Sequence, residues 1–509
     1  MSLTSDIPAP HTTIDVLVIG AGPTGLTAAL EAQRLGMSVR IVERHPERIH
    51  RSKALVVHAR TMEMFDTLGI AERLRSRGEV FRALNLHGSA GATGRIDLDE
   101  LPWGDTDHPY WLTSPQYETE KVLEEELAEA DVDIEWGTTF ERLEQDDTGV
   151  LAHLRSDAAF PVRARWLVGA DGGRSAVRTS IGGRMDRDDA EATFLLADAY
   201  TTSNLKQDEG HFYLHPDGML VIVPMPQNDL WRIIAHVPGA DASDETPIDA
   251  AFLDDLIQRR ASLQFGAHDV GWTSRFALTH GVADINHLGR VFLIGDAAHV
   301  HSPVGGQGLN TGVQDAHGLL WRLAVADDLT PEDRDTLLAG FAAERGQVAD
   351  GMVRAVRRAT GLVAGRSPLV RRLFGALAPR LLPAMKRREI LARPAAGLDV
   401  RYQESAMVAA GGGARPAGGP TIDGGSILAT LPFGTWAWIV RDPDIDGPWH
   451  DLPVVRAAIA SEPRLELVRP DGYIAVVGDS VEAVWASVQA RPVLAAAILA
   501  ASGAARKTR

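Results

Sequence analysis

The sequence predicts an α/β protein made of several folded units, and three observations lead to this prediction. A short β-branched stretch, Ile14–Ile19, runs into the glycine-rich turn Gly20–Gly25 and then into an apolar helix, Leu26–Leu35. Between residues 190 and 280, segments of alternating polar and apolar residues are joined by turns, as in an antiparallel sheet. A stretch rich in Gly, Ala and Pro at 409–425 precedes a further group of short strands. A chain of 509 residues accommodates about three such units.

The first unit is a strand, a glycine turn, a helix and a second strand, Ser38–Val42, that ends at Glu43. Gly20 permits a tight turn, Gly22 lets a phosphate approach the backbone, and Gly25 lets the helix pack closely on the sheet. The free N–H groups at the helix start attract phosphates, and a carboxylate after the second strand can accept hydrogen bonds from both ribose hydroxyls. The pattern predicts a Rossmann-like dinucleotide-binding unit, and by itself it does not distinguish FAD from NAD.

Two later segments are predicted to form a second ligand pocket on the same sheet. The apolar strand Trp166–Ala170 runs into Asp171, and the buried strand Val291–Ile294 runs into Gly295-Asp296. The second segment continues through a glycine-rich loop into a helix from about Thr311 to Ala326. An acidic residue leaving a strand, followed by a glycine-rich loop at a helix start, indicates a pocket for the far end of a long, two-lobed cofactor.

Together these motifs resemble those of the class A, single-component flavoprotein monooxygenases of the aromatic hydroxylase type. The motifs occur in the family's order over roughly residues 14–350. Within the family the sequence is most similar to the phenol and polyketide hydroxylases, which carry an additional C-terminal domain. The matching residues are Gly20–Gly25, Glu43, Arg44, Ala59–Glu63, Leu68–Ile70, Gln116, Glu120, Asp171, Gly172, Gly295 and Asp296.

The resemblance implies that the chain binds FAD non-covalently and uses NADPH or NADH as a transient co-substrate, with dioxygen as the oxidant. No second glycine fingerprint follows a strand, and the resemblance places Asp171 and Arg174 near the incoming nicotinamide cofactor. N–H groups of Gly306–Asn310 would stabilise the negative charge on the flavin N1–C2=O2 edge. The family often has arginine where this chain has Lys53. The residues assigned to FAD are Gly20, Gly22, Pro23, Thr24, Gly25, Glu43, Arg44, Lys53, Gln116, Asp171, Asp296, Pro303, Gly306, Gly308, Leu309 and Asn310.

The activity that the resemblance implies is hydroxylation of a phenolic or polycyclic aromatic, polyketide-like compound. In that cycle the nicotinamide reduces FAD, dioxygen adds at flavin C4a, and the distal oxygen of the hydroperoxide is transferred to an electron-rich ring. A hydrogen-bond partner near the ring would favour the phenolate, and His211, Tyr213 and His236 are the substrate candidates, with His215 and Arg232 nearby in sequence. We assign no catalytic base.

Composition and resemblance together divide the chain. The predicted FAD-binding domain spans 1–189 and 281–352, the substrate-binding sheet domain spans 190–280, and linking helices span 353–408. The linking segment is rich in Arg and Lys, which we interpret as a solvated face. The tail, 409–509, resembles the thioredoxin-like domain of some hydroxylases, but it has no cysteine for thiol chemistry. We expect it to act structurally or in a homodimer.

Composition argues against several other classes of protein. Lys and Arg total 51 against 68 Asp and Glu, and the formal net charge of −17 argues against nucleic acid as a partner. The absence of cysteine excludes disulfides, Cys-ligated zinc and iron–sulfur clusters. With neither a secretory signal nor a run of about 20 apolar residues, we expect a cytoplasmic protein without a membrane partner. His299 and His301 lack a third ligand at useful spacing, so no metal site is predicted.

Three alternatives stay open at this point. Baeyer–Villiger oxidation or N-hydroxylation of a similar aromatic compound would use the same cofactor, and only the product distinguishes them. Trp436–Ile439 is similar to the tryptophan motif of flavin-dependent halogenases, but it lacks the following proline and lies in the tail. A non-catalytic flavin-binding scaffold would not need the loop Pro303–Asn310.

Overall fold

The structure is a computed structural model that describes residues 13–49, 54–88, 93–237, 246–300, 306–364, 373, 375–380, 392–402, 404–409 and 411–507. Of the residues singled out in the sequence, Lys53, His301 and Pro303 lie outside this described part.

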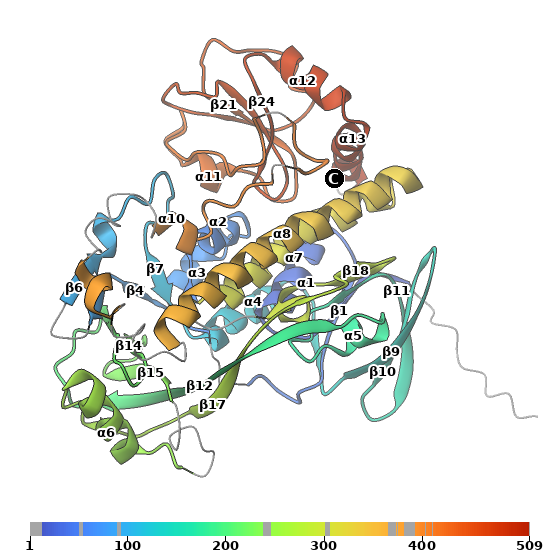
Figure 1. Cartoon of the computed structure of the whole chain (residues 1–509). Helices are drawn as coiled ribbons and strands as arrows, with labels where there is room; N and C mark the ends of the chain where they lie inside the picture. The colour runs from blue at the N-terminus through green and yellow to red at the C-terminus, as the bar shows by residue number, and fades with distance from the viewer. Residues whose placement is uncertain are drawn as a thin grey trace, which may run out of the picture.

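The first sheet lies on one side of the protein, at the right of Figure 1. Its strand β1 pairs in parallel with β11 on one side and β2 on the other, as a Rossmann-like unit requires. The antiparallel hairpin of β9 (Thr139–Asp146) and β10 (Gly149–Arg155) extends from β11. Across the sheet the order is β18 (His287–Leu288), β19 (Val291–Leu293), β11 (Ala159–Gly169), β1 (Ile14–Ile19), β2 (Val39–Glu43) and β8 (Ile134–Trp136).

Both faces of this sheet are covered by apolar cores, and side chains that alternate along β1 contact one core on each face. Val16 and Val18 pack in the core that contains apolar residues of α1 (Pro23–Arg34), α4 (Gln116–Glu129) and α7 (Gln307–Ala326). Leu17 and Ile19 point the other way, into a core shared with β10 and α5 (Ala176–Ser180). The glycine turn after β1 is therefore fixed between two packed layers.

The second sheet lies beside the first. Its strand pairs are antiparallel, except that β13 runs parallel to β5. The short strand β16 (Ala267–His268) also pairs with β12 in the antiparallel direction. Strands β5 and β6 come from residues 83–97, inside the segment that the sequence assigns to the FAD-binding domain. The strand order is β20 (His299–Val300), β17 (Thr273–Ala283), β12 (Met185–Thr201), β15 (Leu230–His236), β14 (Leu220–Pro224), β13 (Glu209–Tyr213), β5 (Ala83–His87) and β6 (Thr93–Asp97).

Shorter elements join the two sheets. A small sheet of β3 (Val56–Val57), β7 (Trp111–Thr113) and β4 (Glu79–Phe81) lies next to α2 and α3. Arg354, Arg357 and Arg358 on α8 are exposed, as a solvated face requires. The remaining helices of this part are α2 (Ala59–Thr67), α3 (Ala71–Arg75), α6 (Ala250–Ala261), α8 (Pro331–Ala364), α10 (Ala392–Ala395) and the 3-10 turns Leu98–Glu100 and Gly295–Ala297.

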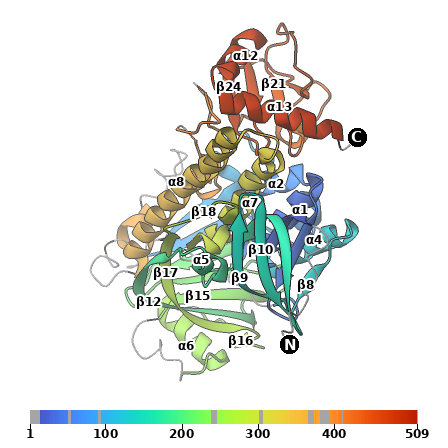
Figure 2. The ribbon, with the colours of Figure 1, turned by 90° about the vertical axis from the view of Figure 1, so that its right-hand side faces the viewer.

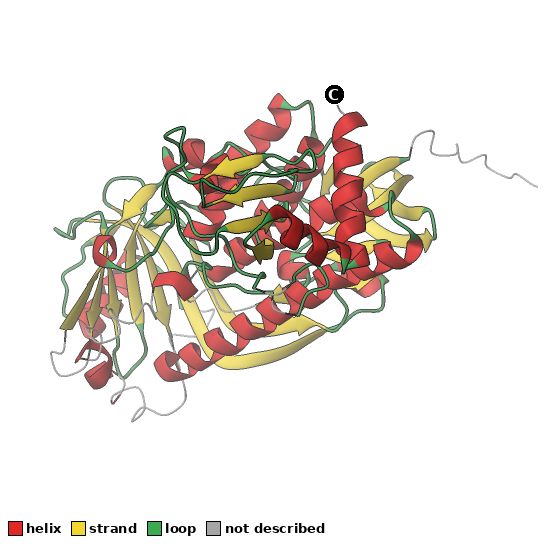
Figure 3. Ribbon diagram, turned by 90° about the horizontal axis from the view of Figure 1, so that it is seen from above, coloured by secondary structure: helices red, strands yellow, loops and turns green. Residues whose placement is uncertain are grey.

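The C-terminal domain packs on α2, α7 and α8, at the opposite end of the molecule from α6 (Figures 1 and 2). Seen from above, it lies over the middle of the molecule, with strands of the other sheets on either side (Figure 3). Trp436 and Trp438, the tryptophans of the halogenase-like motif, are fully buried in its core. Its elements are α11 (Ile427–Thr430), a sheet in the order β22 (Val454–Arg456), β21 (Ala437–Val440), β23 (Leu465–Val468) and β24 (Ile474–Gly478), and then α12 (Val481–Gln489) and α13 (Pro492–Lys507).

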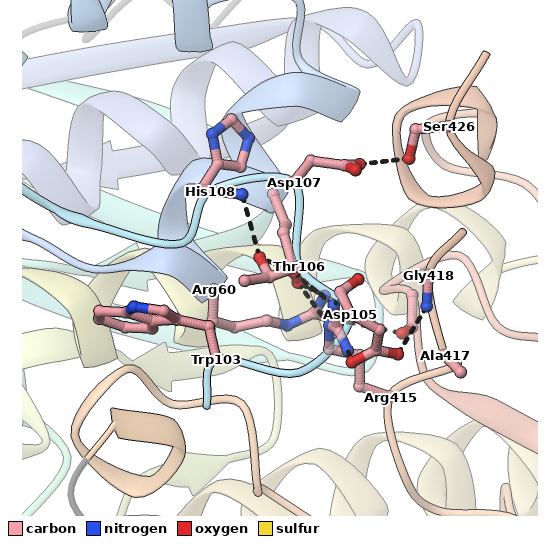
Figure 4. Close-up of polar contacts among 12 residues, drawn as sticks. Arg60, Trp103, Asp105, Thr106, Asp107, His108, Arg415, Ala417, Gly418 and Ser426 are labelled. Atoms are coloured by element: carbon pink, nitrogen blue, oxygen red, sulfur yellow. Dashed lines mark hydrogen bonds and ion pairs between the residues drawn. The ribbon is translucent and has the colours of Figure 1, made fainter. Parts of the chain in front are cut away.

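The glycine-rich segment before this domain is packed rather than loose. A Cβ at Gly418 would lie 2.0 Å from the carbonyl oxygen of Asp105. Arg415 is buried, and its guanidinium contacts the Glu63 carboxylate at 2.6 Å. It also contacts the Asp105 carboxylate at 3.1 Å (Figure 4). These contacts fasten the segment to α2 and to the loop before β7.

Within the described residues, no single helix is both long and apolar enough to cross a membrane. Only Val481–Gln489 and Pro492–Ser502 taken together reach that length and composition, and this pair is bent by 110°.

Candidate cofactor and substrate site

The glycine turn after β1 is tight at its two ends and open in the middle. Gly20 has φ +105°, and a Cβ there would lie 2.5 Å from the carbonyl oxygen of Ala170. A Cβ at Gly25 would lie 1.9 Å from the carbonyl oxygen of Gly20, whereas one at Gly22 would meet no atom within 4 Å. The turn therefore packs closely against the sheet and leaves open space at the start of α1, where Pro23 is the first helical residue.

Thr24 is the point at which the first and last motifs meet. A Cβ at Gly295 would lie 2.7 Å from the Thr24 Oγ1, and a Cβ at Gly312 on α7 would lie 2.1 Å from it. Gly295 also has φ +57°, a conformation that favours glycine. The two glycines thus make room for Thr24 and bring the turn that contains Asp296 against the start of α1.

Glu43 lies at the end of β2, as the sequence predicts. Its carboxylate accepts hydrogen bonds from the backbone N–H groups of Ala21 at 2.9 Å and His45 at 3.1 Å. The side chain therefore faces the glycine turn, and the neighbouring Arg44 is exposed.

Gln116 begins α4 and donates a hydrogen bond to the carboxylate of Glu120 at 2.8 Å. Burial raises the pKa of Glu120 to about 7, and the negative charge of Glu43 adds to this effect. Gln116 and Glu43 thus belong to one polar group at the edge of the first sheet.

Asp171 follows β11, and its carboxylate is used within its own turn. It accepts hydrogen bonds from the Ser175 hydroxyl at 2.5 Å and from the backbone N–H groups of Ala176 at 2.7 Å and Val177 at 3.2 Å. These contacts shape the start of α5. Arg174, in the same turn, is exposed.

Arg178 connects the Asp171 turn to the Asp296 turn. It is buried, and it donates to the carbonyl oxygen of Ala297 at 2.8 Å and to that of Gly173 at 2.9 Å. This role of Arg178 was not predicted from the sequence.

Asp296 itself is exposed in the short 3-10 turn Gly295–Ala297. Asp315 on α7 lies on the buried side of this turn. Its Oδ2 accepts from the Gly295 N–H at 2.9 Å and from the His299 Nε2 at 2.6 Å. The turn is therefore supported inside the protein while the Asp296 carboxylate faces solvent.

The start of α7 is joined to the segment before α2. Gly306 adopts φ +64° at the helix N-cap. The Asn310 Oδ1 accepts from the His58 N–H at 2.8 Å, and its Nδ2 donates to the carbonyl oxygens of Val56 at 2.9 Å and Gly306 at 2.7 Å. The Asn310 side chain thus contacts other parts of the protein, and what the helix start offers a ligand is its backbone N–H groups, the first of which have no acceptor within the helix.

The structure brings most of the predicted FAD residues to one region, where β1 and β11 end and α1 and α7 begin. Glu43, Arg44 and Gln116 lie further along, at the end of β2 and the start of α4. The residues in the shared region are Gly20, Gly22, Pro23, Thr24, Gly25, Asp171, Asp296, Gly306, Gly308, Leu309 and Asn310.

The second sheet has two distinct faces. On β15, Arg232, Ile234 and His236 share one face because side chains alternate, and the Arg232 Nη1 donates to the Ala54 carbonyl oxygen at 3.3 Å. Ala54 lies just before β3, so this face, which we term the inner face, points toward the first sheet. The outer face is covered by α6, whose apolar residues pack in one core with alternate residues of β12, β14 and β15.

Burial differs between these faces. Outer-face residues such as Leu220, Ile222 and Ile233 are completely buried. The inner face carries buried Phe194 and Met219 and, beside them, a set of apolar side chains that are only partly covered. Its half-buried members are Leu84, Leu86, Phe212, Val221, Val223, Ile234 and Phe276.

The three predicted substrate residues lie on opposite faces. His211 and Tyr213 alternate with Phe212 and point to the outer face, where their rings stack with His87. Burial lowers the pKa of His211 to about 4. His236 lies on the inner face, with its ring 5.6 Å from that of Phe194. The structure therefore does not bring these three side chains together.

A groove of about 700 Å³ opens between the residues that follow β2 and one end of strands β12 and β15 in the second sheet. This volume is in the range of ligand pockets. Its lining includes His45, Arg48, Tyr117, Asp198 and Trp272.

Comparison with known proteins identifies the family. A family model described as an FAD binding domain matches residues 13–356. The chain is 34% identical to 12-dehydrotetracycline 5-monooxygenase/anhydrotetracycline 6-monooxygenase of Streptomyces rimosus subsp. rimosus, over 76% of this chain and 77% of that protein. It is 36% identical to 6-methylpretetramide 4-monooxygenase of Streptomyces rimosus over 69% of this chain, and it spans 62% of that relative's length. The chain belongs to the FAD-dependent aromatic monooxygenases.

A solved structure agrees with this family assignment. The anhydrotetracycline hydroxylase OxyS from Streptomyces rimosus superposes with a TM-score of 0.74 at 30% identity, covering 93% of this chain and 96% of that one. The α/β fold with mixed sheets is therefore that of the aromatic hydroxylases.

In this monooxygenase, several residues that shape the site were not predicted from the sequence. Arg178 contacts the Asp171 and Asp296 turns, and Asp315 contacts the Asp296 turn from its buried side. Asp198 forms a bidentate ion pair with Arg232 at 2.8 Å on the inner face. The only sequence signal was a charged residue in an apolar segment, such as Asp315 within the apolar helix α7. A buried charge of this kind requires a partner, but the sequence does not say which.

Proposed function

We propose that this chain uses NADPH or NADH and dioxygen to hydroxylate a phenolic or polycyclic aromatic, polyketide-like compound. The observation that carries the proposal is the arrangement of two surfaces. The open glycine turn meets the Asp296 turn at Thr24. On the inner face of the second sheet, Arg232 donates to the Ala54 carbonyl oxygen, which also accepts from the backbone N–H of Gln116 at the start of α4. A redox cofactor and a flat apolar substrate would thus lie next to each other.

The residues present fit FAD. The space at Gly22 admits a pyrophosphate, and the backbone N–H groups at the starts of α1 and α7 favour its negative charge. Glu43 would accept hydrogen bonds from the ribose, and the exposed Asp296 from the ribityl or pyrophosphate part. Bound FAD would supply the electron transfer from the nicotinamide to dioxygen.

Asp171 and Arg174 are our candidates for contact with the nicotinamide cofactor. Arg174 is exposed at a turn next to the glycine turn, where a phosphate of the cofactor could reach it. The carboxylate of Asp171 already accepts three hydrogen bonds, so its contribution would be to shape this turn.

The inner face would bind the substrate. Half-buried Phe212, Val221, Ile234 and Phe276 offer an apolar surface that spans several strands, which suits a fused-ring compound more than a single small ring. This surface also excludes water from the reacting ring. His236 is the polar candidate on this face, and we assign no catalytic base.

The C-terminal domain is proposed to be thioredoxin-like. Its sheet order β22-β21-β23-β24, with one parallel pair followed by two antiparallel pairs and helices after the last strand, supports this inference. Without cysteine it cannot perform thiol chemistry, and we propose that it acts structurally or in a homodimer.

The test is substrate-stimulated oxidation of NADPH and NADH by purified flavin-loaded protein, screened over phenols, naphthoquinones and anthraquinones. Product mass and NMR identify the reaction. A new ring hydroxyl supports the proposal. Ring expansion or an N–O bond would assign the Baeyer–Villiger or N-hydroxylating alternative, and a yellow protein that oxidises neither nicotinamide with any compound would indicate a scaffold.

A further inference from the structure

The Asp296 turn is attached to α7 through one buried carboxylate. The Asp315 Oδ2 accepts hydrogen bonds from the Gly295 N–H at 2.9 Å and the His299 Nε2 at 2.6 Å, on either side of Asp296. Asp315 and His299 are 2% and 3% exposed, so no bulk solvent competes for these contacts. The position of the turn therefore depends on the orientation of this carboxylate.

Arg345 on α8 sets that orientation. Its Nε donates to the Asp315 Oδ1 at 2.6 Å and its Nη2 to the Thr311 carbonyl oxygen at 3.2 Å. Burial alone would raise the pKa of the Asp315 carboxyl, but the charges of His299 and Arg345 lower it to about 2. Asp315 is therefore ionised at neutral pH and needs both partners.

The remaining side of the Arg345 guanidinium is bound by Tyr402. Its Nη1 donates to the Tyr402 Oη at 3.0 Å. Tyr402 lies on the chain that leads into the C-terminal domain, and its ring is 4.5 Å from that of Tyr473. The Tyr402 backbone N–H donates to the Gly413 carbonyl oxygen at 2.9 Å, and so the tyrosine is fixed by the C-terminal domain.

We infer that Tyr402 and Arg345 are positioning residues for FAD. They act through Asp315 on the Gly295–His299 turn, and the C-terminal domain thereby contributes to FAD affinity although none of the assigned FAD residues lies in it. The Arg345 guanidinium is bound by Asp315, Thr311 and Tyr402 and so holds the Asp315 carboxylate in one orientation. Loss of the Tyr402 contact would let the guanidinium and the carboxylate move.

The most conservative test is Tyr402→Phe, which removes a single oxygen atom. Tyr473→Phe is a matched control, because it makes the same change in the adjoining ring, whose hydroxyl is buried with no hydrogen-bond partner among the described residues. Each flavin-loaded protein is diluted, and the FAD that stays with it is measured by rapid gel filtration over time. The thermal midpoint of each variant is measured in parallel.

We expect Tyr402→Phe to release FAD roughly threefold to tenfold faster than the unmodified protein, with Tyr473→Phe within about twofold of it. Equal release rates for all three proteins would overturn the inference. So would equal acceleration in both variants, or a lower thermal midpoint for Tyr402→Phe without faster release, since a merely structural role has these signatures.

A second variant keeps the test decisive if Tyr402→Phe accumulates poorly. Arg345→Lys keeps the charge but loses the planar fork, and it should release FAD at least as fast as Tyr402→Phe. Unchanged release from Arg345→Lys would also contradict the inference. The measurement contains neither nicotinamide nor substrate, so its result is independent of whether the protein hydroxylates an aromatic compound.

Discussion

Thr24 and Gly312 approach each other so closely that a side chain cannot be added at the second position. A Cβ at Gly312 would lie 2.1 Å from the Thr24 Oγ1, although the two residues belong to helices far apart in the sequence. This contact brings the start of α1 against α7, and with it the glycine turn against the Asp296 turn.

Gly312→Ala is therefore expected to lower the free energy of unfolding by about 1–3 kcal/mol and to reduce the FAD content of the purified protein. The matched control is Gly340→Ala on α8, where an added Cβ would meet no atom within 4 Å. That change should raise stability by about 0.5–1 kcal/mol, because alanine is the better helix former. Denaturant unfolding and flavin absorbance measure both effects.

The pair can also be tested by rescue. Thr24→Ala removes the Oγ1 that a Cβ at Gly312 would meet, so the double variant should regain part of the lost stability. If the losses of stability from the two single variants simply add in the double variant, the contact between residue 312 and the Thr24 Oγ1 does not limit packing.

Asp296 provides a test of FAD placement that does not disturb the fold. Its side chain is exposed, so Asp296→Ala should change stability by no more than about 0.5 kcal/mol while yielding largely flavin-free protein. The exposed Asp423 of the C-terminal domain is a charge-matched control, and Asp423→Ala should keep its FAD. An Asp296→Ala protein that purifies with full flavin content would remove this residue from the cofactor site.

Neighbouring isoleucines on β15 test the substrate face. Ile233 is completely buried on the outer face, and Ile234 is half-buried on the inner face. Ile233→Ala should cost about 2–5 kcal/mol of stability and leave kcat/KM of the folded protein unchanged. Ile234→Ala should cost less stability and lower kcat/KM for a fused-ring substrate by roughly tenfold.

The reverse pattern, with steady-state kinetics altered only by Ile233→Ala, would place the substrate on the face that α6 covers.

Glu120 gives a pH-dependent prediction. Burial raises its pKa from 4.5 to about 7. Between these pH values Glu120 is therefore protonated in the folded protein and ionised in the unfolded chain. Ionisation of Glu120 therefore costs stability as the pH rises through this window. Glu120→Gln should match the unmodified protein below pH 4.5 and exceed its stability by up to about 3 kcal/mol above pH 7. Denaturant unfolding at pH 4.5 and pH 8 measures this, and a gain of equal size at both pH values would contradict it.

Local patterns in the sequence predicted the first unit well. The strand Ile14–Ile19 has the bounds that the sequence predicts, because the β-branched run and the glycines that end it are adjacent in the chain. Helix α7 begins at Gln307, earlier than the predicted Thr311, because Gly306 takes a left-handed N-cap conformation and Gly308 is tolerated within the first turn. Alternating residues also predicted the second sheet.

What the sequence could not predict depends on contacts between distant residues. The parallel pairing of β5 with β13 joins residues near 85 to residues near 211, and no local pattern specifies it. Alternation along β13 separates His211 from Phe212 but does not say which of them faces the first sheet. In the same way, the sequence shows that Asp315 is a charged residue in an apolar segment, but it does not show that Arg345 and His299 are its partners.

We propose that FAD held between the glycine turn and the Asp296 turn would pass electrons from the nicotinamide to dioxygen, so that one oxygen atom enters an aromatic compound on the inner face and the other leaves as water. The most direct measurement is incorporation of oxygen from isotope-labelled dioxygen into the product, made with the unmodified protein and with Asp296→Ala at equal protein concentration. We expect one labelled hydroxyl on the aromatic ring from the yellow unmodified protein and little or none from the flavin-poor variant. A colourless unmodified protein that takes up no added FAD, or equal labelling by both proteins, would contradict it.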